Sequence, residues 1–105
     1  MKIDNPRYVR DGVHPELHFT LEGRPVVLTP DAKPTLHEAG AVYVGEDLGL
    51  PELTVGLGPG GGTTKVGGCT RDPGVFALYD RFLRDCADGT FRPGPAPRPA
   101  GAQGP

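Results

Sequence analysis

The stretch that decides the fold is DPGVFALYDRFLRDCADG, residues 72–89, because its pattern predicts one amphipathic helix. Asp72 suits the N-cap, Pro73 the first helical position, and Gly89 a left-handed residue at the C-terminal end. Apolar side chains recur at spacings of three and four residues, which places them on one face: Val75, Leu78, Tyr79, Phe82, Leu83 and Cys86.

Charged side chains occupy the opposite face of this helix. Two oppositely charged pairs stand four residues apart, Asp80 with Arg84 and Arg81 with Asp85, and we expect them at the surface. A helix of this length cannot bury its apolar face alone. The rest of the chain must therefore supply the surface that the helix covers.

The residues before the helix predict short strands rather than further helices. Residues 17–21 alternate between apolar and polar side chains, and 25–29 follow after a turn, which predicts a hairpin. Residues 35–39 are compatible with a helical turn or a short strand, and we favour a loop. Further strands are expected at 7–10, 41–44, 53–57 and 63–66. The prediction is an α+β fold: a small, mostly antiparallel sheet of about four to six short strands with one C-terminal amphipathic helix packed on it.

Composition limits the folded part to one small domain. The chain has 105 residues, of which 17 are Gly and 13 are Pro. We expect a single domain over residues 1–89, with an irregular N-terminal arm at about 1–7. Residues 90–105 are rich in Pro and Gly and predict an extended or disordered tail outside the core.

Charge and hydropathy exclude several classes of protein. The formal net charge is −2 and the basic residues are scattered, which argues against nucleic-acid binding. No apolar run has the length of a membrane span, and the first residues lack the apolar core of a signal peptide. We expect a protein of the cytoplasm, or of an assembly formed there. Cys69 and Cys86 stand at opposite ends of the helix, too far apart for a disulfide, and we expect two thiols.

A glycine-rich stretch gives the first candidate site. Backbone N–H groups of glycines can bind an anion, and a following lysine adds positive charge. Under this hypothesis the ligand-binding residues are Gly60, Gly61, Gly62, Thr63, Thr64 and Lys65. The spacing does not match a Walker loop, because no glycine directly precedes Lys65. The competing interpretation is the tip of a hairpin.

Cys69 is the second candidate, as a catalytic thiol. A thiol close to a helix N-terminus and to Arg71 has surroundings that favour the thiolate, although Asp72 brings a negative charge to the same place. No base for it can be identified from the sequence. His14 and His18 are four apart in a predicted strand, too distant to share one ion. The sequence therefore predicts no metal and no cofactor.

The tail gives the third candidate, a partner-binding segment. Its residues combine two cationic side chains with prolines at every second position: Arg92, Pro93, Pro95, Pro97, Arg98 and Pro99. No two of these prolines have the spacing of a PxxP motif.

No motif in the sequence specifies a chemistry, and no acid, base and nucleophile stand together. Our first hypothesis is therefore a structural or protein–protein interaction protein, a component of or accessory to a larger assembly such as an adaptor, a complex subunit or a shell accessory protein. Its partner would be another protein or a second copy of the chain. The alternative is a small enzyme or ligand-binding protein that uses residues 60–65 and Cys69. The lack of a catalytic constellation favours a protein that is not an enzyme.

Overall fold

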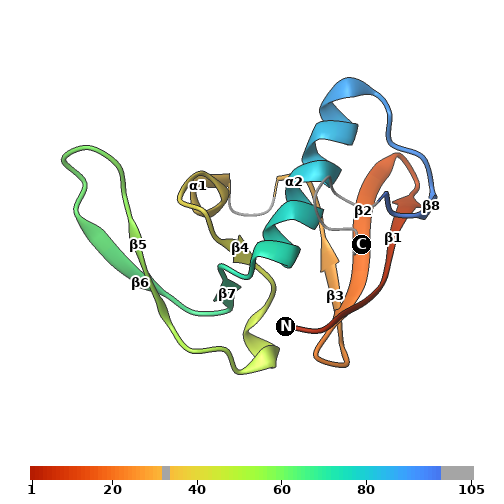
Figure 1. Ribbon diagram of the computed structural model, residues 1–105. Helices are drawn as coiled ribbons and strands as arrows, with labels where there is room; N and C mark the ends of the chain where they lie inside the picture. Colours follow the sequence, from red (N-terminus) through yellow and green to blue (C-terminus); the bar gives the residue numbers. More distant parts are fainter. Residues whose placement is uncertain (32–33, 98–105) are drawn as a thin grey trace, which may run out of the picture.

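A computed structural model describes residues 1–31 and 34–97 of the protein and confirms the α+β fold (Figure 1). The strands pair antiparallel throughout this part of the chain. A four-stranded sheet has the order β3-β2-β1-β8, and two two-stranded sheets are β4-β7 and β5-β6. The sheet strands are β1 (Ile3–Asp11), β2 (His14–Leu21), β3 (Arg24–Leu28), β4 (Val42–Tyr43), β5 (Leu53–Gly56), β6 (Thr63–Val66), β7 (Cys69–Thr70) and β8 (Gly94–Pro95). The helices are α1 (Pro34–Glu38), the 3₁₀ turn η1 (Glu46–Leu48) and α2 (Pro73–Asp88).

Two tight turns set the register of the large sheet. Between β1 and β2, Gly12 has a φ of 62° at the first turn position, as a type II′ turn requires. Between β2 and β3, Glu22 and Gly23 have φ of 51° and 79°, which fits a type I′ turn. Both turns match the right-handed twist of the strands, so the predicted hairpin over residues 17–29 forms.

Helix α2 begins and ends where the sequence predicts. The Asp72 carboxylate accepts a hydrogen bond from the Val75 N–H at 3.1 Å, and Gly89 is left-handed with a φ of 74°. Its apolar face packs on the four-stranded sheet, as Figure 1 shows. The core formed between them contains Val75, Leu78, Tyr79 and Phe82 of the helix with Tyr8, Leu17, Phe19, Leu21, Val26 and Leu28 of the sheet.

The structure differs from the prediction at both ends of the chain. Residues 3–7, expected in an irregular arm, belong to β1. Phe91, expected outside the core, is 5 % exposed and stacks on the ring of Tyr8 with centroids 4.9 Å apart. Residues 94–95 then pair with β1 as β8. The predicted core ended too early, because the high Pro and Gly content of residues 90–105 indicated a tail outside the core. One aromatic side chain in this segment, Phe91, is nevertheless buried against the sheet.

Local differences are found in the middle of the chain. Residues 34–38 form α1 rather than a loop, and the strand expected over 41–44 is limited to Val42–Tyr43. The pairing of β4 with β7 was not predicted, since Cys69–Thr70 is only two residues long. Several strands are this short, and the structure therefore has more of them than the sequence indicated.

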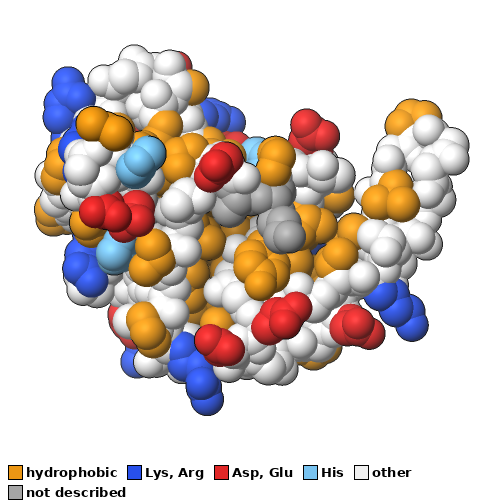
Figure 2. Space-filling model, turned by 180° about the vertical axis from the view of Figure 1, so that it is seen from behind, with side chains coloured by type: hydrophobic (Ala, Val, Ile, Leu, Met, Phe, Trp, Pro, Cys, Tyr) orange, Lys and Arg blue, Asp and Glu red, His pale blue; other side chains and the backbone are white. Residues whose placement is uncertain are grey.

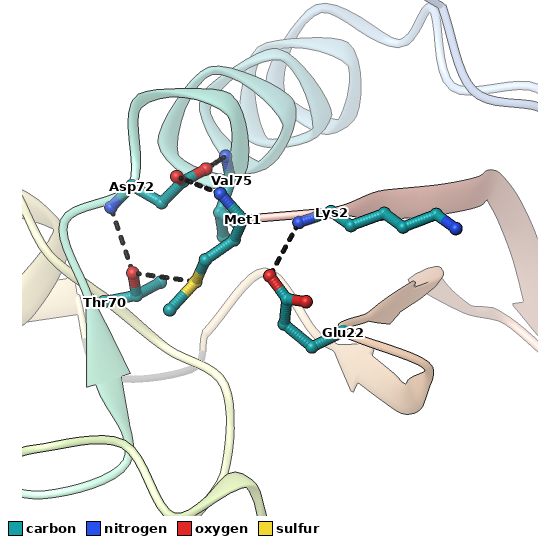
Figure 3. A network of polar contacts seen from close by, with 6 residues as sticks. All are labelled: Met1, Lys2, Glu22, Thr70, Asp72 and Val75. Carbon is teal, nitrogen blue, oxygen red and sulfur yellow. Dashed lines mark hydrogen bonds and ion pairs between the residues drawn. The ribbon is translucent and has the colours of Figure 1, made fainter.

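The N-terminus of α2 holds a small polar network (Figure 3). The α-amino group of Met1 lies 3.1 Å from Asp72 Oδ1, while Asp72 Oδ2 caps the helix. Thr70 Oγ1 accepts a hydrogen bond from the backbone N–H of Asp72 at 3.0 Å. One carboxylate therefore links the first residue of the chain to the start of the helix.

Asp72→Ala should lower the free energy of unfolding by about 1 kcal/mol, the usual value of a lost N-cap. Asp72→Asn retains the capping oxygen and loses only the charge. It should therefore lower the free energy of unfolding by only a few tenths of a kcal/mol, in line with the small contribution of exposed ion pairs. Urea unfolding of both variants checks the difference. Equal losses would show that the ion pair, rather than the cap, stabilises this end.

Candidate functional site

The hairpin β5–β6 projects from the body of the protein (Figure 1). From behind, it forms an arm that stands apart from the rest of the surface (Figure 2). Among the described residues, its base packs on the body: Val55 is buried in a second small core with Ala41 and Cys69, and Leu53 and Val66 pack against it. Arg71 also donates a hydrogen bond to the Thr54 carbonyl at 2.9 Å. The hairpin is therefore fixed at one end and presents the other to solvent.

The register shows which backbone groups of the hairpin point outward. The N–H of Leu57 donates to the Gly62 carbonyl at 2.9 Å, so the backbone groups of Leu57 point toward the opposite strand. In an antiparallel hairpin, residue pairs that hydrogen-bond to each other alternate with pairs that do not. Val55 and Thr64 therefore form a hydrogen-bonded pair, whereas the backbone N–H and carbonyl groups of Gly56 and Lys65 point away from the hairpin. In the described part of the chain no other strand pairs with either outer edge of the hairpin.

A hydrogen-bonded β-turn closes the tip of the hairpin. The Gly61 N–H donates to the Gly58 carbonyl at 3.0 Å, and Gly60 has a φ of 77°. Pro59 in the second position and a left-handed glycine in the third are the residues that a type II turn requires. Leu57, directly before this turn, is a large apolar side chain that remains 47 % exposed.

A hollow of about 340 Å³ lies beside the tip, on the β5 side of the hairpin. Helix α1 forms the facing wall. The lining residues are Thr35, Glu38, Ala39, Gly56, Leu57 and Gly58. Because Gly56 has no side chain, its backbone lines the hollow.

The six residues of the anion hypothesis lie together, but as turn and strand. Gly60, Gly61 and Gly62 belong to the tip, and Thr63 to Lys65 to β6, all of them exposed. One of the N–H groups that would face an anion, that of Gly61, is used to close the turn. The structure brings these residues together without building a phosphate loop.

Cys69 lies in the second core and is 1 % exposed. Its thiol donates to the Gly67 carbonyl, with sulfur and oxygen 3.4 Å apart. The glycines before it do not open a path for a substrate, since Gly68 is packed against Gly45 and Tyr43. Cys86 is half-buried, and burial, together with the charge of Asp85, raises the pKa of its thiol.

The tail residues are placed in part. The guanidinium of Arg92 donates to the carbonyls of Gly89 and Phe91, at 3.1 and 2.7 Å. Pro93 is exposed, Pro95 belongs to β8, and Pro97 is half-buried. Arg98 and Pro99 lie outside the described residues.

Two histidines contact different parts of the protein. Nε2 of His18 lies 2.8 Å from a carboxylate oxygen of Glu16, and the His37 ring stacks on Phe76. Within residues 1–31 and 34–97, no three His, Cys, Asp or Glu side chains gather in a way that could hold a metal ion. None of the helices in that part of the chain is long and apolar enough to cross a membrane.

Sequence reasoning missed a buried carboxylate with three side-chain hydrogen-bond donors. Asp85, expected at the surface, is 5 % exposed and accepts hydrogen bonds from Tyr8, Thr90 and Arg81 at 2.6, 2.7 and 3.2 Å. The spacing to Arg81 was visible in the sequence, whereas Tyr8 lies 77 residues away. The carboxylate itself is buried, and its partners come from β1, from α2 and from the residues directly after α2, so it links these three segments.

Comparison with known proteins adds no relative from which a role can be transferred. The chain matches no family model, no curated protein and no solved structure at a significant level.

Proposed function

We propose that this is a protein–protein interaction protein that contacts its partner through the β5–β6 hairpin. The observation that carries the proposal is the projecting hairpin itself, which among the described residues packs on the body at its base and carries the exposed side chain of Leu57 near its tip.

The physical chemistry of small sheets supports this assignment. A two-stranded hairpin is marginally stable in water unless another strand or helix packs on it. Here no further strand of the described residues pairs with the hairpin, and a hollow lies between its outer half and α1, while the turn chemistry at Pro59 and Gly60 keeps its shape defined. A preorganised arm loses less conformational entropy on binding, which favours affinity.

The alternative, an enzyme that uses Cys69, has less support. A nucleophile must reach its substrate, and this thiol lies in a small apolar core.

A photo-crosslinking amino acid at position 57 tests the proposal, with the same amino acid at position 13 as matched control. Val13 is also an apolar residue at a hairpin tip and is 80 % exposed, but it lies on the turn between β1 and β2. The intact chain, expressed in its native cells, should give a defined adduct from position 57 and none from position 13. Leu57→Lys should abolish association with the same partner without a change in melting temperature. Equal labelling from both positions, or none from 57, would contradict the proposal.

A further inference from the structure

The hollow beside the hairpin tip has the form of a groove between a strand and a helix. Its volume of about 340 Å³ is within the range of ligand sites in proteins. One wall is the outer side of β5 at Gly56, and the other is α1 at Glu38 together with Ala39, which directly follows this helix. Neither β6 nor the large sheet contributes to the lining.

The exposed sheet edges differ in how they are protected against strand addition. Edge strands are commonly blocked by proline or by charged side chains, lysine above all. The β3 edge carries Arg24 and Pro25, and the β6 edge carries Lys65. The β5 edge has Arg71 bonded to Thr54 at its base, but at Gly56 it has neither a charge nor a side chain. Of these three edges, β5 is open where it faces the groove.

We propose that the groove binds an extended, basic segment of a partner protein, which adds as a strand to the outer edge of β5. The outward N–H and carbonyl of Gly56 supply the main-chain hydrogen bonds, as in other cases of strand addition. A Cβ built on Gly56 would meet no atom within 4 Å, so the space above this backbone is open to the side chains of an added segment.

The charge of the segment follows from Glu38. Its exposed carboxylate lines the groove and forms no ion pair with the described residues. A lysine or arginine of the added segment would pair with it across the groove, while Leu57 and Ala39 offer apolar contact on either side. The occupant is therefore an extended peptide with a basic residue between small or apolar ones.

This inference rests on the proposed function and names the partner's chemistry. The test uses a displayed library of linear peptides, selected on the intact chain. We expect enrichment of lysine or arginine at one position, and amide shifts on binding at Gly56, Gly58 and Ala39. Selection on Glu38→Lys should reverse the preference to acidic peptides.

Two proline variants separate the two edges of the hairpin. Gly56→Pro removes an outward N–H from β5 and no bond of the hairpin ladder, and it should weaken binding of the selected peptides at least tenfold. Lys65→Pro removes the corresponding outward N–H from β6 and should leave binding within about twofold. Circular dichroism and the melting temperature establish that both variants fold.

The outcomes distinguish this inference from the proposed function. No enriched peptide, equal binding to Gly56→Pro, or shifts on another surface would overturn strand addition at β5. Concentration-dependent shifts at the same amides without peptide would assign the groove to a second copy of the chain and would also overturn it. Crosslinking from position 57 that persists in these cases would leave the interaction proposal standing, and its absence would remove both.

Discussion

Asp85→Ala should lower the free energy of unfolding by about 3–5 kcal/mol, a loss comparable to the whole stability of so small a domain. The carboxylate is buried and accepts hydrogen bonds from Tyr8 and Thr90 as well as from Arg81. Alanine would leave the Tyr8 hydroxyl buried without an acceptor, and each such orphaned group costs about 1–3 kcal/mol. Arg81 is partly exposed and can turn to water, so its share of the loss is smaller.

The position of Asp85 explains why this loss affects the whole fold. It lies in the last turn of α2, its hydrogen bond to Tyr8 reaches β1, and its bond to Thr90 holds the chain directly after the helix. Its backbone carbonyl also accepts from the N–H groups of Thr90 and Phe91. Phe91 is thereby directed onto the Tyr8 ring. One residue therefore fixes the helix, the sheet and the start of the tail relative to one another.

Two variants separate the charge of this carboxylate from its hydrogen bonds. Asp85→Asn retains one acceptor oxygen and should cost about half as much as Asp85→Ala. Tyr8→Phe removes the hydroxyl donor but keeps the packed ring, and Asp85 still accepts from Thr90 and Arg81, so this variant should cost about 1 kcal/mol. Denaturant unfolding measures all three. A loss below about 1 kcal/mol for Asp85→Ala would show that water replaces the carboxylate.

The same carboxylate gives the stability a dependence on acid. Burial acts to raise the pKa of Asp85, but the hydrogen bonds from Tyr8 and Thr90 and the charge of Arg81 outweigh it and hold the pKa below its usual value. A lowered pKa in the folded state stabilises the protein above the unfolded pKa, near 3.9 for Asp. That contribution is lost as the pH falls through the folded pKa, and Asp85→Asn should lack this part of the acid dependence.

Local interactions made the larger elements predictable. The caps of α2 depend on Asp72 and Gly89, which stand next to the helix in the sequence, and the prediction of both is confirmed. The hairpin over residues 17–29 follows from alternation and a short turn, and it too is confirmed. The glycines at the tip of β5–β6 were also placed correctly as a hairpin tip.

Contacts between distant segments were not predictable in the same way. Asp85 and Arg81 have the spacing of an ordinary surface pair. Asp85 is buried because Tyr8, 77 residues away in the sequence, packs against it and donates a hydrogen bond to it. Likewise, nothing in residues 34–38 indicates that α1 will face the end of β5 and form the wall of a groove. The candidate site therefore emerged from the structure, although its hairpin was visible in the sequence.

Gly68 gives the second large effect: Gly68→Ala should lower the free energy of unfolding by about 2–4 kcal/mol. Its φ of 72° is left-handed, which costs an alanine about 1–2 kcal/mol. An added Cβ would also lie 2.8 Å from a ring carbon of Tyr43 and 3.0 Å from the backbone of Gly45. Overpacking of this kind typically lowers the free energy of unfolding by a further ~1–3 kcal/mol.

The backbone around Gly68 cannot easily yield. Its carbonyl accepts hydrogen bonds from the N–H groups of both Val44 and Gly45, at 2.7 and 3.1 Å. A shift of this strand away from Gly45 would lengthen those bonds and disturb the pairing of β4 with β7. We therefore expect the strain to open the small core at the base of the hairpin, where Cys69 lies.

The neighbouring glycine provides the matched control. A Cβ on Gly67 would meet only a carboxylate oxygen of Glu46, at 4.0 Å, and its φ is outside the left-handed range. Gly67→Ala should therefore change stability by less than about 0.5 kcal/mol, as substitutions without a contact usually do. Urea unfolding and the alkylation rate of Cys69 measure both effects, and the rate should rise only in Gly68→Ala. If Gly68→Ala were as stable as Gly67→Ala, with Cys69 equally protected, the close approach of β7 to residues 43–45 would not be a constraint on this fold. The two adjacent glycines would then be interchangeable, contrary to the geometry that gives each of them a different neighbour.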